Sequence, residues 1–333
     1  MKKILVTGGS GFIGTNLVNF LLKKQYIVSN IDKLSDISTP EKFKDKNINY
    51  IFYKFNLSNE AKLKKILLKK FDIIIHLAAE SHVDRSIDRP KLFFSENINS
   101  TLTLYDSISN LVKLKKISSP KIIHISTDEV YGSNKTGLSN ENSKIFTSSP
   151  YSASKAASEN IAQSYSETYS LKTCILRISN NYGPFQSPEK FIPKMISRIL
   201  EKKVIPLYSK GENIREWIYI EDTCGAILKV IENFKDKSIY NVGSSIRFSN
   251  IDLLKKMFKK FQYSHDKIKY VKDRPGHDYR YALNSSLFRK DYKWKPKYNF
   301  NTGMLKTISW YKKNNKWLKA VKTKFLDIRI GKI

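Results

Sequence analysis

The stretch TGGSGFIG, residues 7–14, follows a short apolar run and precedes a segment with apolar residues at helical spacing. Its glycines at positions 8, 11 and 14 permit a tight turn and let the backbone approach a pyrophosphate, and the helix that follows offers free N–H groups to the anion. A glycine-rich turn alone is a weak signal. The order of strand, turn and helix makes it specific and predicts a dinucleotide-binding site.

Asp32 ends the second apolar run, 18 residues past Gly14. A carboxylate at this place accepts hydrogen bonds from the ribose hydroxyls of an adenosine and repels a 2′-phosphate. The sequence therefore favours NAD over NADP as the cofactor. Lys33 follows directly, and its positive charge would soften this discrimination.

The first half of the chain alternates short apolar runs with longer amphipathic segments, which is typical of a parallel sheet with crossover helices. Strands are expected at 4–7, 27–31, 50–55, 73–77, 122–126 and 173–178, and helices at 13–24, 60–70, 91–113 and 150–169. Beyond residue 179 prolines separate shorter elements, with helices expected near 191–202, 221–233, 249–261 and 302–314. We expect a Rossmann-type, doubly wound α/β fold. Residues 1–178 would form the cofactor domain, and residues 179–333 a smaller, interleaved α/β substrate-binding lobe.

The chain carries 60 basic and 30 acidic residues, a formal charge of +30. Such a charge makes nucleic acid or an anionic surface a serious alternative partner. However, the basic residues are mostly lysines scattered in pairs along expected helix faces, and no nucleic-acid-binding motif accompanies them. We expect a solvated surface and no nucleic-acid partner. Salt-sensitive DNA binding without turnover would instead favour a nucleic-acid-binding protein on a degenerate dinucleotide fold.

Cys174 and Cys224 are the only cysteines, and they stand far apart in apolar contexts. They suggest neither a disulfide nor a metal site, and a reducing cytoplasm suits them. The apolar run at residues 4–6 is too short for a signal peptide, and no stretch approaches the ~20 apolar residues that cross a bilayer. We expect a cytoplasmic enzyme with no metal ion and no membrane contact.

Tyr151 and Lys155 lie four residues apart at the start of an expected helix and so share one face. A nearby ammonium favours the phenolate and lowers the pKa of a tyrosine from ~10 toward the working pH, which makes the tyrosine a usable base for a hydroxyl proton. An exposed helix pair is the ordinary alternative. The glycine-rich turn earlier in the chain favours the catalytic interpretation.

Thr127, Asp128 and Glu129 directly follow the expected strand at 122–126. Open α/β sheets bind their ligands beyond the carboxyl ends of the strands, so this trio is expected next to the substrate. Two adjacent carboxyl groups can divide acid and base roles if their environments separate their pKa values. A turn or a helix cap also uses such a pair, but the position beyond the strand favours catalysis.

These motifs are accompanied by AAESHVDRS at 78–86, RISNNYGP at 177–184, PEKFIP at 188–193, IREW at 214–217 and DRPGH at 273–277. Together they resemble the extended short-chain dehydrogenase/reductases, and within them the sugar-nucleotide 4,6-dehydratases. The resemblance covers essentially the whole chain. The acidic pair is its most discriminating element, because related epimerases and decarboxylases do not usually carry it. The resemblance also implies a homodimer formed through the helices expected at 91–113 and 150–169.

The resemblance implies that dTDP-glucose is converted to a 4-keto-6-deoxy sugar in a closed redox cycle with NAD. Tyr151, assisted by Lys155 and Thr127, would take the proton of the sugar 4-hydroxyl. Glu129 would remove the C5 proton, and Asp128 would protonate the departing 6-hydroxyl, which requires a raised pKa. A UDP-glucose 4,6-dehydratase, or an epimerase or decarboxylase of the same superfamily, is the alternative.

The resemblance further implies which residues bind each ligand. The expected cofactor contacts are Gly8, Gly11, Phe12, Ile13, Gly14, Asp32, Lys33, Asn56, Leu57, Leu77, Ala78, Ala79, Tyr151, Lys155 and Asn181. The expected substrate contacts are Ser81, Thr127, Asn180, Lys190, Phe191, Pro206, Tyr208, Arg215, Asn250, Arg274 and His277. The two arginines suit a diphosphate because guanidinium binds phosphate oxygens bidentately. The chain departs from the family pattern at Asn56, where aspartate is common, at Glu96, which replaces a threonine, and at Thr223, which replaces a histidine.

Overall fold

The structure is a computed structural model that describes residues 1–35, 38–39, 47–264 and 267–322. The last part of the expected second lobe, 323–333, lies outside these residues. Within the described ranges no helix combines the length and apolar character needed to span a membrane.

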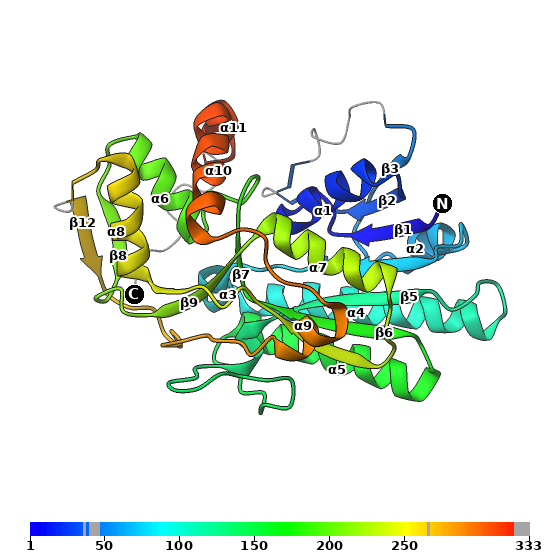
Figure 1. Ribbon diagram of the computed structural model, residues 1–333. Helices are drawn as coiled ribbons and strands as arrows, with labels where there is room; N and C mark the ends of the chain where they lie inside the picture. Colours follow the sequence, from blue (N-terminus) through cyan, green and yellow to red (C-terminus); the bar gives the residue numbers. More distant parts are fainter. Residues whose placement is uncertain (36–37, 40–46, 265–266, 323–333) are drawn as a thin grey trace.

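A seven-stranded parallel sheet lies at the centre of the molecule, in the order β3-β2-β1-β4-β5-β6-β10 (Figure 1). Its strands are β1 (Lys3–Thr7), β2 (Ile27–Asp32), β3 (Tyr50–Lys54), β4 (Ile73–His76), β5 (Lys121–Thr127), β6 (Thr173–Ile178) and β10 (Ser238–Val242). The six expected strands are confirmed, each to within one residue at either end. The order reverses beside β1, which pairs with both β2 and β4, and a reversal of this kind is where open sheets bind ligands.

Helices cover both faces of this sheet, and the alternation of side chains along β1 shows how. Ile4 and Val6 face one hydrophobic cluster, which includes residues of α1 (Phe12–Lys23) and α7 (Ile220–Glu232). Leu5 faces a second cluster, which includes residues of α2 (Glu60–Leu67), α4 (Pro90–Lys113) and α5 (Pro150–Tyr169). The near-continuous apolar sequence of the inner strands follows from this double covering.

The helix α5 begins where its sequence signals place it. The Ser149 side chain accepts a hydrogen bond from the Ser152 backbone N–H, the Ser152 side chain accepts one from the Ser149 backbone N–H, and Pro150 occupies the first turn. Such a capping box fixes the helix start to a single residue. Tyr151 and Lys155 therefore lie in the first two turns, with their side chains directed as the helical spacing predicts.

The second lobe contains two small sheets and several helices. One sheet joins β7 (Asn180–Tyr182), β9 (Ile214–Tyr219) and β11 (Arg247–Ser249), and the other joins β8 (Ile205–Tyr208) and β12 (Ile268–Val271). The helices are α6 (Phe191–Leu200), α8 (Asn250–Phe261), α9 (Ser286–Tyr292), α10 (Phe300–Lys313) and α11 (Asn315–Lys322). The eight expected helices of the whole chain are confirmed, each to within three residues at either end.

The short elements were not predicted. The strands of the second lobe have three to six residues, and α3 (Val83–Asp88) and α9 have six and seven. The predicted strands of the main sheet are equally short, but they are near-continuous apolar runs. Strands such as β7 (Asn180–Tyr182), β11 (Arg247–Ser249) and β12 (Ile268–Val271), in contrast, contain polar residues and are too short to show a hydrophobic period. The strand β10 pairs with β6 in the main sheet although it lies beyond residue 178, so the expected boundary separates six strands of the sheet from the seventh.

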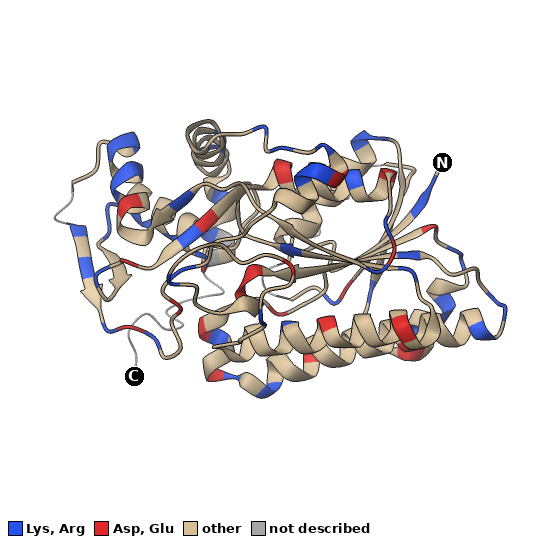
Figure 2. Ribbon diagram, turned by 60° about the horizontal axis from the view of Figure 1, so that its bottom comes forward, with Lys and Arg blue, Asp and Glu red and all other residues tan. Residues whose placement is uncertain are grey.

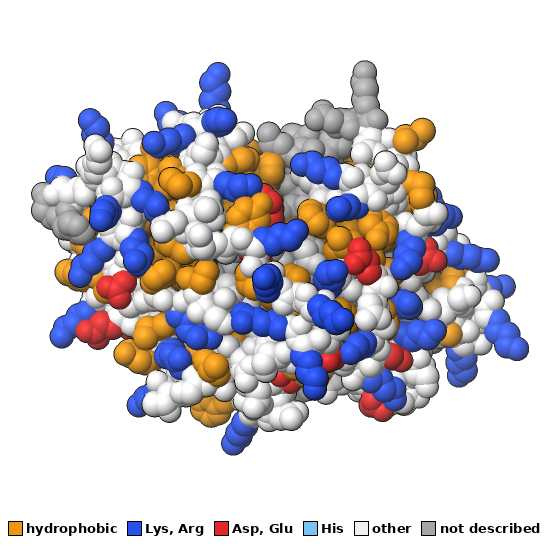
Figure 3. Space-filling view, in the orientation of Figure 1, with side chains coloured by type: hydrophobic (Ala, Val, Ile, Leu, Met, Phe, Trp, Pro, Cys, Tyr) orange, Lys and Arg blue, Asp and Glu red, His pale blue; other side chains and the backbone are white. Residues whose placement is uncertain are grey.

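The charged residues are spread over the surface. In Figure 3 Lys and Arg side chains are dispersed over the visible face, with apolar and acidic side chains between them. Figure 2 shows the same scatter along the helices, and it shows α4 and α5 lying side by side with few charges along their length.

Candidate active site

A cavity of about 410 Å³ opens at the carboxyl edge of the main sheet and extends to the second lobe. Its lining includes every residue that the sequence predicted as a catalytic, cofactor or substrate residue. The structure therefore brings together residues spread from Gly8 to His277 in the chain. Their individual contacts with ligands stay predictions. The volume is in the range of small-molecule sites.

One end of the cavity is formed by the glycine-rich turn. Gly8 has a φ of +73°, and a Cβ there would lie 2.7 Å from the backbone of Ala78; a Cβ on Gly14 would lie 2.2 Å from the carbonyl oxygen of Gly8. The helix α1 starts after Gly11 with no side-chain cap and no acidic residue in its first turn. An uncapped helix N-terminus beside closely packed glycine backbone fits the pyrophosphate of a dinucleotide.

Asp32 lies at the end of β2, next to this turn. Its Oδ2 accepts a hydrogen bond from the Ser10 backbone N–H at 3.0 Å, and its Oδ1 accepts one from the Leu34 N–H at 2.8 Å. Burial raises the pKa of this carboxyl group, and these backbone bonds work against the rise. The carboxylate is thus fixed in place at the end of the strand, as expected from the sequence.

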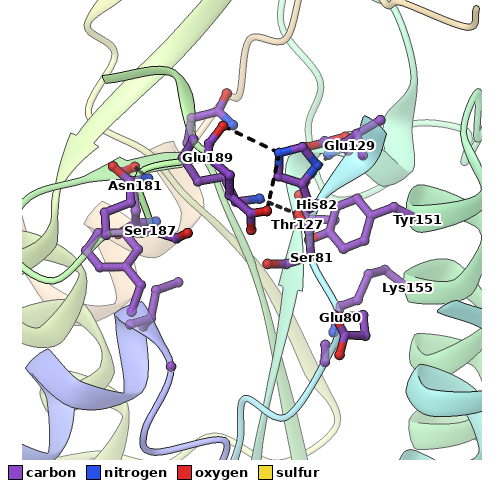
Figure 4. Close-up of a pocket in the computed structure, with 18 of the residues that line it drawn as sticks. Glu80, Ser81, His82, Thr127, Glu129, Tyr151, Lys155, Asn181, Ser187 and Glu189 are labelled. Atoms are coloured by element: carbon purple, nitrogen blue, oxygen red, sulfur yellow. Dashed lines mark hydrogen bonds and ion pairs between the residues drawn. The ribbon is translucent and has the colours of Figure 1, made fainter. Parts of the chain in front are cut away.

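The predicted catalytic residues come from three elements, β5, the short 3₁₀ helix η2 (Asp128–Tyr131) and α5, and those labelled in Figure 4 point toward one space. Thr127 ends β5 and caps η2, where its Oγ1 accepts a hydrogen bond from the Glu129 N–H at 3.2 Å. Tyr151 and Lys155 project from α5 toward the same space. All five residues are buried, and Asp128 is only 2% exposed to solvent.

The environments of Asp128 and Glu129 differ. Burial raises the pKa of Asp128 well above its usual range, and the charges that act most strongly on it, those of Glu129 and Glu216, raise it further. Burial also raises the pKa of Glu129, but the strongest charges there belong to Arg274 and Arg215, which favour its carboxylate. The pair can therefore hold a proton on Asp128 and a negative charge on Glu129, as an acid and a base require.

The expectation that Lys155 lowers the pKa of Tyr151 is wrong for the protein without ligands. Burial raises the pKa of Tyr151, the charge of Glu129 raises it further, and a side-chain hydrogen bond with Thr127 acts in the opposite direction. Lys155 Nζ donates to the Ile125 carbonyl oxygen at 2.8 Å, and burial lowers its own pKa to about 8. Desolvation is the largest influence on the pKa of this phenol, ahead of its neighbouring charges and hydrogen bond.

A buried ion pair behind the catalytic residues was not predicted. The Arg177 guanidinium on β6 binds the Glu159 carboxylate on α5 at 2.7 Å, and Ser126 on β5 donates a hydrogen bond to the same carboxylate. The pair joins three elements directly behind Lys155. Removing one partner of such a pair costs about 3–5 kcal/mol, so it holds α5 firmly against the sheet.

The other end of the cavity is cationic and aromatic. Arg274 pairs with Asp84 of α3 at 2.7 Å, and the Arg215 guanidinium lies 4.3 Å from the centre of the Tyr281 ring. Lys190 Nζ donates to the Ser81 carbonyl oxygen. These three cations suit a diphosphate. Aromatic contacts continue the wall, with Phe191 stacked on Trp217 and Tyr208 edge-on to His277.

Several buried polar atoms of the cavity have no hydrogen-bond partner in the described protein. They include Asp128 Oδ2, Glu129 Oε2, Asn180 Oδ1, Ser187 Oγ and Arg274 Nε. Buried polar groups are normally satisfied, so this concentration of unpaired atoms fits a polar ligand. Within the same residues no group of three or more His, Cys, Asp or Glu side chains is arranged to hold a metal ion.

The cavity also contains residues to which sequence reasoning gave no role, namely Glu80, His82, Asp84, Glu189, Trp217 and Tyr281. His82 caps α3 and its Nε2 lies 3.4 Å from the Glu189 carbonyl oxygen (Figure 4). Arg85 pairs with the Glu189 carboxylate at 3.3 Å. The sequence feature that could have indicated these residues is the run at 80–85, which contains Glu80, Asp84 and Arg85 and begins four residues after the buried strand β4. By contrast Asn181, an expected cofactor contact, directs its amide to Ser179 and Thr223.

The fold and the site together define a class of protein. A parallel sheet with a glycine-rich dinucleotide cradle, and a Tyr-x-x-x-Lys pair at the end of the same sheet, define an enzyme of the extended short-chain dehydrogenase/reductase type. A family model described as GDP-mannose 4,6 dehydratase matches residues 5–307. The chain belongs to this family.

Relatives and solved structures match over nearly the full chain. It is 40% identical to the probable dTDP-glucose 4,6-dehydratase of Sinorhizobium fredii (strain NBRC 101917 / NGR234), over 97% of this chain and 96% of that one. It is 39% identical to dTDP-glucose 4,6-dehydratase 1 of Escherichia coli (strain K12), over 96% of each. The crystal structure of the dTDP-glucose 4,6-dehydratase DesIV from Streptomyces venezuelae, which has NAD bound, superposes with a TM-score of 0.92 at 34% identity, covering 96% of this chain and 99% of that chain.

Proposed function

We propose that the enzyme converts dTDP-glucose to dTDP-4-keto-6-deoxy-glucose and water, with NAD as its cofactor. The similar proteins of Sinorhizobium fredii and Escherichia coli are named for dTDP-glucose 4,6-dehydratase activity. The observation that carries the proposal is the placement of Tyr151, Asp128 and Glu129 in one cavity with the dinucleotide cradle. An epimerase needs only the redox step, whereas removal of water also needs an acid and a base.

The glycine-rich turn and Asp32 would hold NAD, which would supply an acceptor for the hydride of sugar C4 and a donor for its return to C6, and whose positive nicotinamide ring would favour a phenolate nearby. Tyr151 takes the proton of the 4-hydroxyl as the C4 ketone forms. Thr127 hydrogen-bonds Tyr151 and holds it toward the sugar. Lys155, fixed by its bond to the Ile125 carbonyl, orients the first turn of α5 and adds positive charge when protonated.

The elimination of water is assigned to the acidic pair. A ketone at C4 acidifies the C5 proton, and Glu129, whose carboxylate form Arg274 and Arg215 favour against the effect of burial, removes it. Asp128, kept protonated by burial and by neighbouring carboxylates, gives its proton to the 6-hydroxyl as that group leaves as water. When the hydride returns to C6, Glu129 gives its proton back to C5. The proton held by Tyr151 then replaces the one that Asp128 gave to water, so the protons balance over one cycle.

We also propose that the enzyme is a homodimer that works in the cytoplasm. Phe94 and Leu102 on α4 are 38% and 42% exposed, and with the half-buried Ile98 they form an apolar stripe at a spacing of four residues. A stripe of this kind on a long helix is a surface that a second copy would cover. Cys174 and Cys224 are free thiols, which suits a reducing compartment, and activity in the cytoplasmic fraction of cells would test it.

The substrate proposal predicts product from dTDP-glucose. Incubation of the protein with dTDP-glucose and NAD should give the alkali-induced absorbance of a 4-keto-6-deoxy sugar, and UDP-glucose serves as the comparison. No described residue separates thymine from uracil by charge, so some turnover of UDP-glucose is compatible with the chemistry. The absence of product from both substrates would reject the dehydratase proposal.

The roles proposed for Glu129 and Tyr151 predict that their variants stop the reaction at different steps. Glu129→Gln should still oxidise C4 and accumulate the absorbance of bound NADH, because only the C5 base is missing. Tyr151→Phe should form no NADH at all, because no group takes the 4-hydroxyl proton. We expect turnover to fall by about two to four orders of magnitude in both, the usual contribution of a general acid or base.

Matched controls are available on the same helix as Tyr151. Glu167 is an exposed acid and Tyr169 is 54% exposed, so Glu167→Gln and Tyr169→Phe should leave turnover unchanged. Normal turnover by Glu129→Gln would remove that residue from the mechanism. NADH formation by Tyr151→Phe would show that Tyr151 is not needed as the base for C4 oxidation.

The dimer proposal predicts a mass near twice 38.6 kDa in light scattering. Leu102→Glu should convert the protein to monomers, because a charge would be buried at the centre of the interface. Leu305→Glu is the control, since Leu305 on α10 is 56% exposed and lies outside the stripe. A wild-type protein that is monomeric at micromolar concentration contradicts the proposal.

A further inference from the structure

The adenosine end of the cavity contains a charged cluster that the proposed reaction does not use. Lys33 Nζ lies 3.1 Å from Glu80 Oε1 and 3.0 Å from Glu96 Oε2. All three side chains line the cavity together with Asp32 and Asn56. The lysine thus bridges two carboxylates that come from different elements, one from the loop after β4 and one from α4.

The position of Lys33 matters for the choice of cofactor. It directly follows Asp32, the residue whose carboxylate is placed to accept the adenosine ribose hydroxyls. A basic side chain at this point of the fold is the means by which related sites accommodate a 2′-phosphate. A lysine with no acidic partner here would therefore work against Asp32 and favour NADP.

The structure shows why Lys33 does not act in this way. Burial works to lower its pKa, but the charges and hydrogen bonds of Glu80 and Glu96 outweigh burial and raise the pKa, so the ammonium is charged and engaged with both carboxylates. Glu80 and Glu96 contact the cation, and the neighbouring Asp32 brings the number of acidic groups at this end of the cavity to three. The excess negative charge repels a 2′-phosphate.

Glu96 is itself held in place. Asn56 Nδ2 donates to both of its oxygens, at 3.4 and 3.2 Å, and Asn56 Oδ1 accepts the Ser58 backbone N–H at 3.0 Å, which orients the amide. In contrast, Glu80 Oε2 also lies 3.6 Å from Arg85 Nη2, so the Glu80 carboxylate interacts with a second cation. Of the two carboxylates, Glu96 is the one that forms an ion pair with Lys33 alone within the part of the chain that the structure describes.

We propose that Glu96 determines the cofactor specificity of this enzyme, by holding Lys33 in an ion pair and adding negative charge beside Asp32, so that the site takes NAD and rejects NADP. The inference rests on the proposed use of NAD. It concerns the adenosine half of the cofactor alone, and no step of the sugar chemistry depends on it.

The test measures binding rather than turnover. The full-length protein is titrated with NADH and with NADPH, and the nicotinamide fluorescence gives both dissociation constants. Wild type should prefer NADH. Glu96→Gln should improve the affinity for NADPH relative to NADH about tenfold, the worth of one charge-assisted hydrogen bond, because Lys33 becomes available to the 2′-phosphate. Glu96→Thr should act in the same direction.

Two further variants separate the contribution of Lys33 from the general effect of removing a carboxylate. Lys33→Met combined with Glu96→Gln should lose most of the gain, because the cation that would bind the phosphate is gone. Glu60→Gln is the matched control, since Glu60 pairs with Lys64 on the exposed face of α2, and the ratio of affinities should not change. Unchanged thermal unfolding of each variant shows that the fold is intact.

The outcomes are distinct. An unchanged ratio of NADPH to NADH affinity in Glu96→Gln and Glu96→Thr overturns the inference and leaves the proposed dehydratase function standing. A gain that persists in full in the double variant overturns the role of Lys33. If the wild-type protein binds neither nucleotide, the proposed use of NAD fails, and the inference fails with it.

Discussion

Two carboxyl groups on consecutive residues share one buried site, and the separation of their electrostatic environments is the constraint on which the rest of the site depends. Burial alone would raise the pKa of Asp128 and Glu129 together and leave two weak acids. The protein separates them with charges from different directions. Carboxylates act most strongly on Asp128, whereas the guanidinium groups of Arg274 and Arg215 act most strongly on Glu129. The proposed acid and the proposed base are thus neighbours in the sequence.

This separation requires both lobes of the molecule. Asp128 and Glu129 follow β5 of the main sheet, while both arginines belong to the second lobe. Arg274 reaches across to Asp84 on α3, so a residue 190 positions away in sequence fixes the cation beside Glu129. The catalytic environment therefore exists only when the second lobe is packed over the carboxyl edge of the sheet. The buried Arg177 and Glu159 pair plays the corresponding part behind the edge, where it keeps α5 in register with β5 and β6.

Sequence reasoning succeeded where the pattern is local. The glycine-rich turn, the strand ends at Asp32 and Thr127 and the helix start before Tyr151 depend on residues close in sequence, and each lies where it was expected. The resemblance to a known family then placed distant residues such as Arg274 in the same cavity. Patterns of a few residues carried no information about β10 or α3, because their place depends on partners far away in the chain.

Electrostatic effects were predicted less well for the same reason. The pKa of Tyr151 depends on how completely the folded protein removes the phenol from water, and spacing to Lys155 does not reveal this. The cluster of Lys33, Glu80 and Glu96 joins three elements, and only the folded chain shows that Lys33 is paired. The sequence indicated which residues were unusual at this end of the site, but their contacts had to come from the structure.

The central claim is that oxidation at C4 is temporary and that the same hydrogen returns to C6 within one active site. Turnover of dTDP-glucose carrying deuterium at C4, followed by NMR or mass spectrometry of the product, measures this directly. The account predicts deuterium in the C6 methyl group of the 4-keto-6-deoxy sugar, with none released to unlabelled NAD in solution. Loss of the label to solvent or to free cofactor would contradict it.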